Sequence, residues 1–300
     1  MEELSEAWRK KRECEVLLEP EPTFRESGLA LVDDDGGGLV RVDWRIDLAL
    51  TLYSIDSAWP GAVETPDAVG AKFLRMLDSL TRASGCFSDW MSSDEYAGDK
   101  QYLIESLHSD IGSWVRAHVA LDDDGRPQPS DGYWLVGVSG GVVVSPKPPE
   151  GTSKKASFYV KAGSAFRNYA HFEIGSDFQA PDPAVVTYSL YRAALVSMIS
   201  LWPAPWANAQ CAIWGERPPT LPGEPAFPYS GYQMPWISYL CAERAAKVDV
   251  APAIKTERTA DGGLLMTATE ARFDPANVEH MRASRLMAQI MMRYGGNPDA

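Results

Sequence analysis

The sequence predicts an α+β protein in which an antiparallel or mixed sheet packs with several helices. Some apolar segments alternate with polar residues at every second position, as strands do, and others repeat apolar residues every three or four positions, as helices do. The two kinds of segment do not follow the regular strand–helix–strand order of a parallel sheet. We therefore expect a single domain, or two tightly packed halves that divide near residues 146–151.

The composition is that of a folded, acidic protein. The 300 residues include 41 acidic and 28 basic side chains, and the formal charge is −13. This balance argues against nucleic-acid binding, because the neutralisation of phosphates needs Lys and Arg. No run approaches the roughly 18 apolar residues of a membrane span, and the N-terminus lacks the apolar core of a signal peptide.

The cysteines indicate the compartment. They show no CxxC spacing, and a chain of this size needs no disulfide framework, so we expect reduced thiols in the cytoplasm. The lack of a long apolar run gives the separate expectation of no association with a membrane. These cysteines are Cys14, Cys86, Cys211 and Cys241.

The chain is expected to begin with an appendage. Residues 1–27 are mostly charged and end in a Glu-Pro-Glu-Pro run, so they predict a helical arm, and residues 28–300 predict the α+β domain. Asp33, Asp34 and Asp35 precede three glycines, a composition typical of a turn between extended segments. Residues 40–53 then alternate as a strand. This acidic run does not have the ligand spacing of a calcium loop.

Four segments have the apolar spacing of helices, and they cover residues 65–84, 100–117, 182–202 and 274–291. In the first, Thr65 is expected to cap the helix and Pro66 to take the first helical position. The last two begin with an Asp-Pro pair, so Asp182 and Asp274 are expected as their caps. Strands are expected at 133–144, 157–166, 169–174, 210–214 and 264–269, with a short apolar segment at 236–242.

One motif suggests a catalytic serine. Residues 137–141 read Gly-Val-Ser-Gly-Gly and match the G-x-S-x-G pattern of hydrolases, with Ser139 as the nucleophile. That chemistry needs a strand, a sharp turn and then a helix. The segment that follows, VVVSPKPPEG, is too rich in valine and proline for a long helix. A glycine-rich bend between two strands is therefore the favoured interpretation.

The sequence shows no cofactor or metal site. The histidines, His108, His118, His171 and His280, do not have the spacing of a zinc motif and are expected to be ordinary surface or core residues. Neither a phosphate-binding loop nor a dinucleotide fingerprint is present. We therefore expect no metal, no cofactor, no catalytic residues and no enzymatic activity.

Aromatic and acidic residues are the candidates for contact with a protein partner. Trp and Tyr are frequent anchors of interfaces, and acidic runs attract a basic partner. Large core side chains and solvated turns are nevertheless the favoured explanation of the same residues. The candidates are Asp33, Asp34, Asp35, Asp94, Glu95, Asp122, Asp123, Asp124, Trp206, Trp214, Tyr229 and Tyr232.

Several short segments occur in a recognisable order. Residues 56–65 (DSAWPGAVET) lead into a helix that closes at 87–90 (FSDW), a later helix ends at Leu201-Trp202 before the turn 203–206, and PWISYL follows at 235–240. This order resembles the immunity protein 52 family over about residues 40–250. Where the family usually has Gly and Thr in the last segment, this chain has Pro235 and Ser238.

The resemblance implies a bacterial immunity protein of a polymorphic toxin system, with type VI secretion as one route of toxin delivery. Members typically accompany toxins with a restriction-endonuclease-like domain and block the toxin's active site or its assembly. Such a protein has no catalytic residues, and its expected partner is a basic, nuclease-type toxin. The alternatives are a serine hydrolase that uses Ser139 and a structural component of a secretion system.

Overall fold

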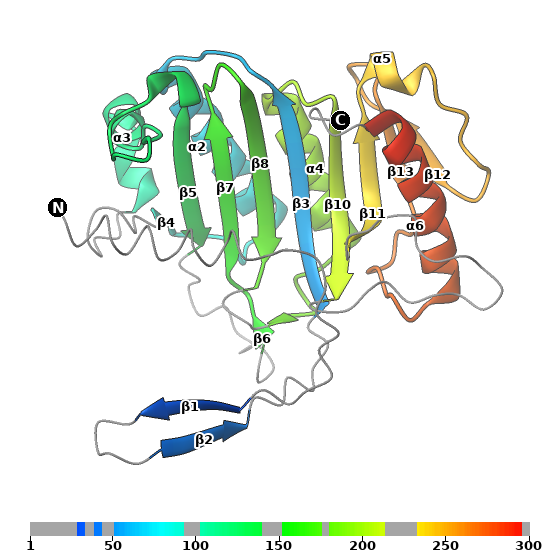
Figure 1. Ribbon diagram of the computed structural model, residues 1–300. Helices are drawn as coiled ribbons and strands as arrows, with labels where there is room; N and C mark the ends of the chain where they lie inside the picture. The colour runs from blue at the N-terminus through cyan, green and yellow to red at the C-terminus, as the bar shows by residue number, and fades with distance from the viewer. Residues whose placement is uncertain are drawn as a thin grey trace. The chain divides into compact units, whose positions relative to one another are not determined.

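The computed structural model describes residues 29–33, 39–43, 51–92, 103–139, 152–175, 180–213 and 233–295, and every structural statement below concerns these ranges. The α+β class is confirmed. A nine-stranded antiparallel sheet has the order β12-β13-β11-β10-β3-β8-β7-β5-β4, with helices packed on it (Figure 1). Strands from before and after residues 146–151 alternate within this one sheet, so it is a single domain and not two halves.

The strands of this sheet are β3 (Thr51–Pro60), β4 (Trp90–Ser92), β5 (Tyr133–Ser139), β7 (Ala156–Ala162), β8 (Arg167–Ile174), β10 (Trp206–Ile213), β11 (Gln233–Leu240), β12 (Lys255–Arg258) and β13 (Leu264–Thr267). The helices are α2 (Pro66–Ala83), α3 (Ile111–Ala117), α4 (Tyr188–Leu201), α5 (Ala242–Ala245) and α6 (Val278–Ile290), with 3-10 turns at Ile104–Leu107 and Pro129–Asp131 and a π-helical turn at Met291–Gly295. Two short strands, β6 (Thr152–Ser153) and β9 (Ala180–Pro181), pair in parallel.

A separate hairpin precedes the sheet in the chain. It consists of β1 (Leu29–Asp33) and β2 (Leu39–Asp43), which pair antiparallel from Leu29 opposite Asp43 to Asp33 opposite Leu39. The expected turn with Asp34 and Asp35 lies between these strands, outside the described residues, as does the expected arm at 1–27.

The main core lies between one face of the sheet and the helices α2 and α4. The period-two pattern of β3 sends Ile55 and Trp59 to this face, where both are fully buried. Trp59 stacks on Trp202, which follows α4, with ring centroids 5.5 Å apart. The ring centroids of Tyr191 on α4 and Trp236 on β11 lie 5.2 Å apart. Large aromatic side chains therefore fill the layer between helices and sheet, as the core-filler interpretation of the tryptophans predicts.

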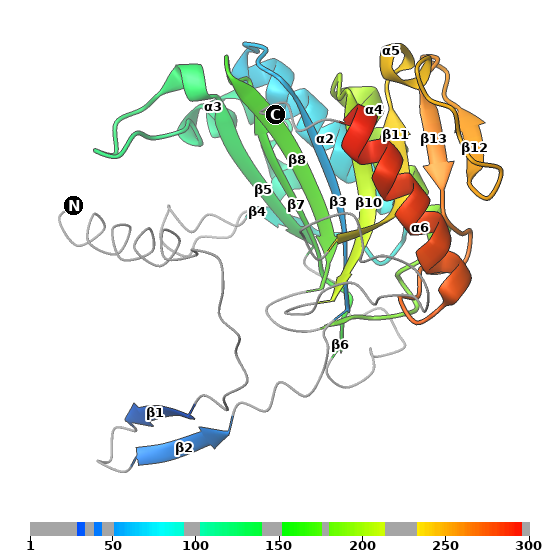
Figure 2. The ribbon, with the colours of Figure 1, turned by 45° about the vertical axis from the view of Figure 1, so that its right-hand side comes forward.

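The helix α6 lies on the opposite face of the sheet, over β11 and β13 (Figure 2). A smaller cluster fills this interface, with Leu240 and Met266 from the sheet and Met287 from α6 all fully buried. Val278, in the first turn of this helix, is 42% exposed. Within the described residues, no helix is both long enough and apolar enough to cross a membrane.

The first predicted helix is confirmed in its details. Thr65 caps α2 by accepting a hydrogen bond from the Ala68 amide at 3.3 Å, and Pro66 takes the first helical position. The expected apolar stripe is buried against the sheet, with Phe73 and Leu80 fully inaccessible. The prediction succeeded because capping by Thr65 and the preference of proline for the first helical position depend only on residues of the first turn.

Asp182 and Asp274 were predicted to cap two helices, and both predictions were wrong for the same reason. Asp182 accepts a hydrogen bond from the Ala184 amide, and Asp274 does the same for Ala276, so each aspartate closes a local turn in place of capping a helix. The helices begin later, where Thr187 caps α4 and Asn277 caps α6, each through its side-chain oxygen.

Other differences concern length and continuity. The helix expected at 100–117 is two pieces, Ile104–Leu107 and α3, because residues 108–110 form a turn between them. The strand β10 begins at Trp206, four residues before its expected start. Pro235 stands inside β11, where the register with β10 shifts, because a bulge accommodates a residue that has no amide hydrogen to donate.

Two strands of the nine-stranded sheet were not predicted at all, β4 and β12. Both are at the edges of the sheet. All four residues of β12 are exposed, and Glu257 on it forms an ion pair with Arg192 of α4 at 2.5 Å. A strand with no buried face shows no alternation of apolar and polar residues, and for this reason the sequence did not predict β12.

Candidate functional site

The face of the sheet opposite α2 and α4 stays accessible over β5, β7, β8 and β3, and we call this region the open face (Figure 2). Alternate residues of these strands point to it, and the strand register sets them side by side in rows. One row is Trp134, Lys161, Tyr169 and Ala58, the next is Val136, Tyr159, His171 and Asp56, and the third is Val138, Ser157, Glu173 and Ser54.

The centre of the open face is an ion-pair cluster. The Nδ1 atom of His171 lies 2.7 Å from Oδ1 of Asp56, and its Nε2 atom lies 3.3 Å from Oε2 of Glu173. Burial by itself lowers the pKa of His171, but the hydrogen bonds and charges of the two carboxylates outweigh it and raise this pKa to about 10. His171 is therefore protonated at neutral pH and donates from both ring nitrogens.

The second oxygen of Asp56 is also engaged. It accepts hydrogen bonds from Ser54 Oγ at 3.2 Å and from Nε2 of Gln210, a buried residue of β10. The cluster thus joins three strands through one carboxylate. A histidine that already holds its proton at neutral pH is not available as a general base there.

Aromatic rings continue the open face beside the cluster. Trp134 and Tyr169 meet edge to face with ring centroids 5.4 Å apart, and Nζ of Lys161 lies 5.3 Å from the Trp134 ring. The ring centroids of Tyr159 and His171 lie 5.8 Å apart. Burial raises the pKa of Tyr169 to about 12, so its hydroxyl keeps its proton. Rings held in this way form a firm surface that offers both apolar area and hydrogen-bond donors.

Three loops at one end of these strands are braced against one another, and we call residues 61–65, 129–131 and 163–166 the braced loops. The Ala62 amide donates to the Ser164 carbonyl, and the Ala165 amide donates to the Ser130 carbonyl, both at 2.8 Å. The fully buried Asn168 donates to the Pro60 and Ser164 carbonyls and accepts from the Ser164 amide. Backbone hydrogen bonds and one amide side chain therefore fix the loop positions.

The braced loops present two large apolar side chains to solvent. Val63 is 77% exposed and Phe166 is 71% exposed. Gly61 allows the close approach of their two loops, because a Cβ atom there would stand only 1.9 Å from the Ala165 carbonyl oxygen. We call Val63 and Phe166 the loop tip.

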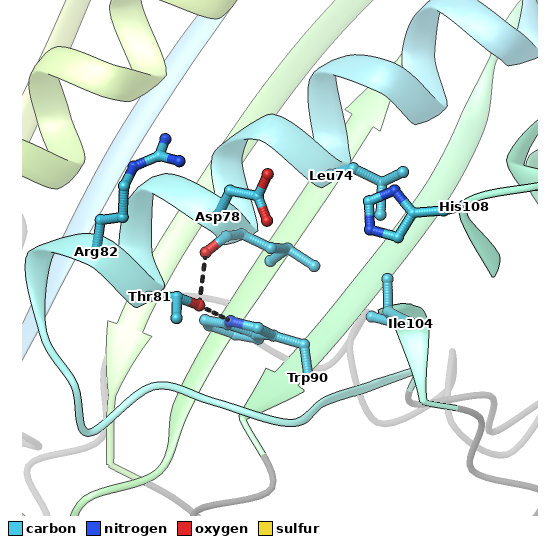
Figure 3. A pocket seen from close by; sticks show the side chains of 8 residues that line it. Leu74, Asp78, Thr81, Arg82, Trp90, Ile104 and His108 are labelled. Atoms are coloured by element: carbon cyan, nitrogen blue, oxygen red, sulfur yellow. Dashed lines mark hydrogen bonds between the residues drawn. The ribbon is translucent and has the colours of Figure 1, made fainter. Parts of the chain in front are cut away.

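A small pocket opens between α2, β4 and the turn Ile104–Leu107 (Figure 3). It encloses about 150 Å³. Leu74, Leu77, Ile104 and Trp90 form its apolar lining, and Asp78, Arg82 and His108 stand at the sides. Trp90 is held by a hydrogen bond from Nε1 to Thr81 Oγ1 at 3.0 Å. The volume suits a single side chain more than a drug-sized ligand.

Most of the predicted partner contacts fall outside the described side chains. Asp122 accepts hydrogen bonds from the amides of Asp124 and Arg126 and so closes its own turn, while Asp123 and Asp124 are exposed. Trp206 is half-buried and packs with the cluster beneath α6. Asp33 is described only in its backbone, and Asp34, Asp35, Asp94, Glu95, Trp214, Tyr229 and Tyr232 lie outside the described residues.

Ser139 is placed in the core. It is fully buried at the end of β5, and its hydroxyl accepts a hydrogen bond from the Ala156 amide at 2.9 Å. The described cysteines, Cys86, Cys211 and Cys241, are free thiols, and burial raises the pKa of Cys211 to about 12. In the part of the chain that the structure describes, no three His, Cys, Asp or Glu side chains are arranged to hold a metal ion.

The acidity of the chain is unevenly distributed. The described residues include 22 acidic and 19 basic side chains, so they contribute −3 of the formal charge of −13. Most of the negative charge that would attract a basic partner therefore belongs to residues outside the described ranges.

Sequence reasoning missed the ion-pair cluster. His171 was expected to be an ordinary surface or core residue, yet it lies beside Asp56, which is 115 positions away in the chain. The alternation of Tyr169, His171 and Glu173 did indicate one strand face. The identity of the neighbouring strand depends on long-range pairing, which no local pattern reveals.

Comparisons with known proteins show a likeness to solved structures. No family model and no curated protein sequence matches the chain. Among solved structures it is similar to Pseudomonas aeruginosa T6SS protein PA0821, with 11% identity and a TM-score of 0.47, over 82% of this chain and 72% of the other. At that identity and TM-score, no argument about function rests on the likeness.

Proposed function

We propose that this protein is a bacterial immunity protein, which neutralises a toxin by binding it in the cytoplasm and catalyses no reaction of its own. The observation that carries the proposal is the open face. It is a surface of partly exposed aromatic and charged side chains on a sheet, where His171 pairs with Asp56 and Glu173 and Lys161 lies against the Trp134 ring. Interfaces favour such aromatic anchors, because they bring contact area with little loss of side-chain freedom.

The chemistry of the described residues favours binding over catalysis. The one hydrolase-like serine is buried and accepts a backbone hydrogen bond, and the histidine of the cluster is already protonated at neutral pH. A formal charge of −13 favours fast association with a basic partner. The resemblance to the immunity protein 52 family supports a nuclease-type toxin, delivered by type VI secretion, whose active site is blocked.

Co-expression with the reading frame adjacent to this gene tests the proposal. We expect the neighbouring product to be toxic alone, harmless with this protein, and recovered in a complex with it. A toxic neighbour that is neither rescued nor bound would count against an immunity role. Self-association of the purified protein without any protection would instead favour a structural component of a secretion system.

A pair of matched variants tests the open face itself. Trp134 and Val278 are equally accessible, at 43% and 42%, but only Trp134 belongs to the open face. We expect Trp134→Ala to weaken the complex about tenfold or more, as loss of an interface anchor does, and Val278→Ala to leave it unchanged. Equal affinities of the two variants would exclude Trp134 as an anchor.

A further inference from the structure

The interface between α6 and the sheet buries polar side chains whose hydrogen-bonding atoms have no partner. Ser238 of β11 and Ser284 of α6 are fully buried, and Asn208 of β10 is 9% exposed. Within the described residues, the two hydroxyl groups and Oδ1 of Asn208 form no hydrogen bond. Roughly nine in ten buried polar groups in folded proteins do form one, so three such atoms beside one helix need an explanation.

The strand register places Asn208 and Ser238 beneath α6. These two residues stand opposite each other on β10 and β11. Ser238 lies two residues before Leu240, which belongs to one buried cluster with Met287 of α6, and residues two apart in a strand point to the same face. Ser284 precedes Met287 by three residues, so both lie on one side of the helix. The unpartnered atoms therefore belong to the contact between α6 and the sheet.

The contact of α2 with the sheet is of a different kind. All seven buried residues of α2 are apolar or glycine, whereas two of the six buried residues of α6, Ser284 and Arg285, are polar. The apolar part of the α6 contact includes Met287 and Met291, whose flexible side chains define one packing less strictly than branched ones do. Burial of apolar area holds α6 to the sheet, and the cost of unmade hydrogen bonds opposes it.

We propose that α6 is a movable cover, which separates from the sheet in the native protein much more often than α2 does. Separation lets water reach the three polar groups and so removes the cost of their burial. It also uncovers Asn208 and Ser238. Because Asn208 stands opposite Asp56 of β3, these two residues continue the middle row of the open face across β10 and β11. The extent of the open face thus depends on the position of α6.

Hydrogen exchange of the purified full-length protein, followed by mass spectrometry, tests this inference without any partner. We expect the amides of α6 to exchange about tenfold or more faster than those of α2. Ser238→Ala removes one unpartnered hydroxyl from the sheet and leaves the helix itself unchanged. It should slow the exchange of α6 about tenfold, because an apolar group is buried there at lower cost, and the exchange of α2 should stay the same.

Two further variants separate the effect of the hydroxyl groups from that of helix propensity. Ser284→Ala removes the second hydroxyl and should slow the exchange of α6 as Ser238→Ala does. Gln289→Ala, at an exposed position of the same helix, introduces the better helix former without removing a buried polar group. It should leave the exchange of α6 nearly unchanged.

Two results would overturn the inference. Equal exchange of α6 and α2 in the natural protein would mean that α6 does not separate on its own. Exchange of α6 that is unchanged or faster in both serine variants would mean that ordered water satisfies the hydroxyl groups, so that their burial costs little. Neither result bears on the proposed function, because no toxin takes part in the measurement.

Discussion

Asp56 and His171 face each other across β3 and β8, with Oδ1 of the aspartate and Nδ1 of the histidine 2.7 Å apart. Through this ion pair we expect the free energy of unfolding to depend on pH. The same aspartate binds Gln210 of β10, so the pair lies at the meeting point of three strands. Such a cluster favours one strand register, because a shift by one residue would turn each of these side chains to the other face.

The first prediction concerns pH. The pKa of His171 is raised from 6.5 to about 10 in the folded protein, so the folded state holds a proton that the unfolded state has lost between these values. The stabilisation is complete below pH 6.5 and disappears as the pH rises through 10. We expect His171→Gln to lower the free energy of unfolding most at pH 6 and progressively less up to pH 10, as urea titrations would measure.

His108→Gln is the matched control for that series, because His108 is an exposed histidine in a turn. Its effect on the free energy of unfolding should be small at every pH. A difference between the natural protein and His171→Gln that stays constant from pH 6 to 10 would contradict the protonated state of His171.

The second prediction concerns Ser139. Because its hydroxyl accepts the hydrogen bond of the buried Ala156 amide, Ser139→Ala should lower the free energy of unfolding by about 1–3 kcal/mol. Ser200→Ala, at an exposed site near the end of α4, should change it little. A fluorophosphonate probe should leave Ser139 unlabelled in the folded protein. Labelling at Ser139, detected by mass spectrometry, would revive the hydrolase hypothesis.

The third prediction concerns the start of α4. Thr187 accepts a hydrogen bond from the Leu190 amide, so Thr187→Ala should cost about 1 kcal/mol in the free energy of unfolding. Thr187→Ser keeps the capping hydroxyl and should restore most of the loss. Chemical denaturation distinguishes the two, and equal losses would show that the methyl group of Thr187 matters and the cap does not.

The fourth prediction compares two glycines. A Cβ atom at Gly61 would collide with the Ala165 carbonyl, whereas one at Gly85 would meet nothing within 4 Å. Gly61→Ala should therefore destabilise the protein by about 1–3 kcal/mol, and Gly85→Ala should leave it within about 0.5 kcal/mol. Thermal unfolding of both variants measures this difference. A neutral Gly61→Ala would mean that the braced loops adjust easily.

Local patterns predicted the elements better than their ends. The alternation of β8 and the capped start of α2 depend only on neighbouring residues, so the sequence was sufficient for both. The starts of α4 and α6 were wrong because an aspartate before a proline can close a turn as well as cap a helix. Only the fold shows which of these hydrogen bonds is made.

The open face and the braced loops required the structure. Asp56 and His171 were visible as residue types, but their contact depends on β3 pairing with β8 after more than 100 intervening residues. The exposure of Val63 and Phe166 runs against the tendency of apolar residues to be buried, so hydrophobic patterning could not single them out.

The strand β12 leaves a sheet edge whose residues are all exposed, and three of the four, Lys255, Glu257 and Arg258, are charged. An open edge is a template on which another chain can add a strand and extend the sheet into a fibre. Here an incoming strand would have to desolvate these charges and dislodge Glu257 from Arg192. The charges at this edge therefore oppose the addition of further strands and the polymerisation that would follow.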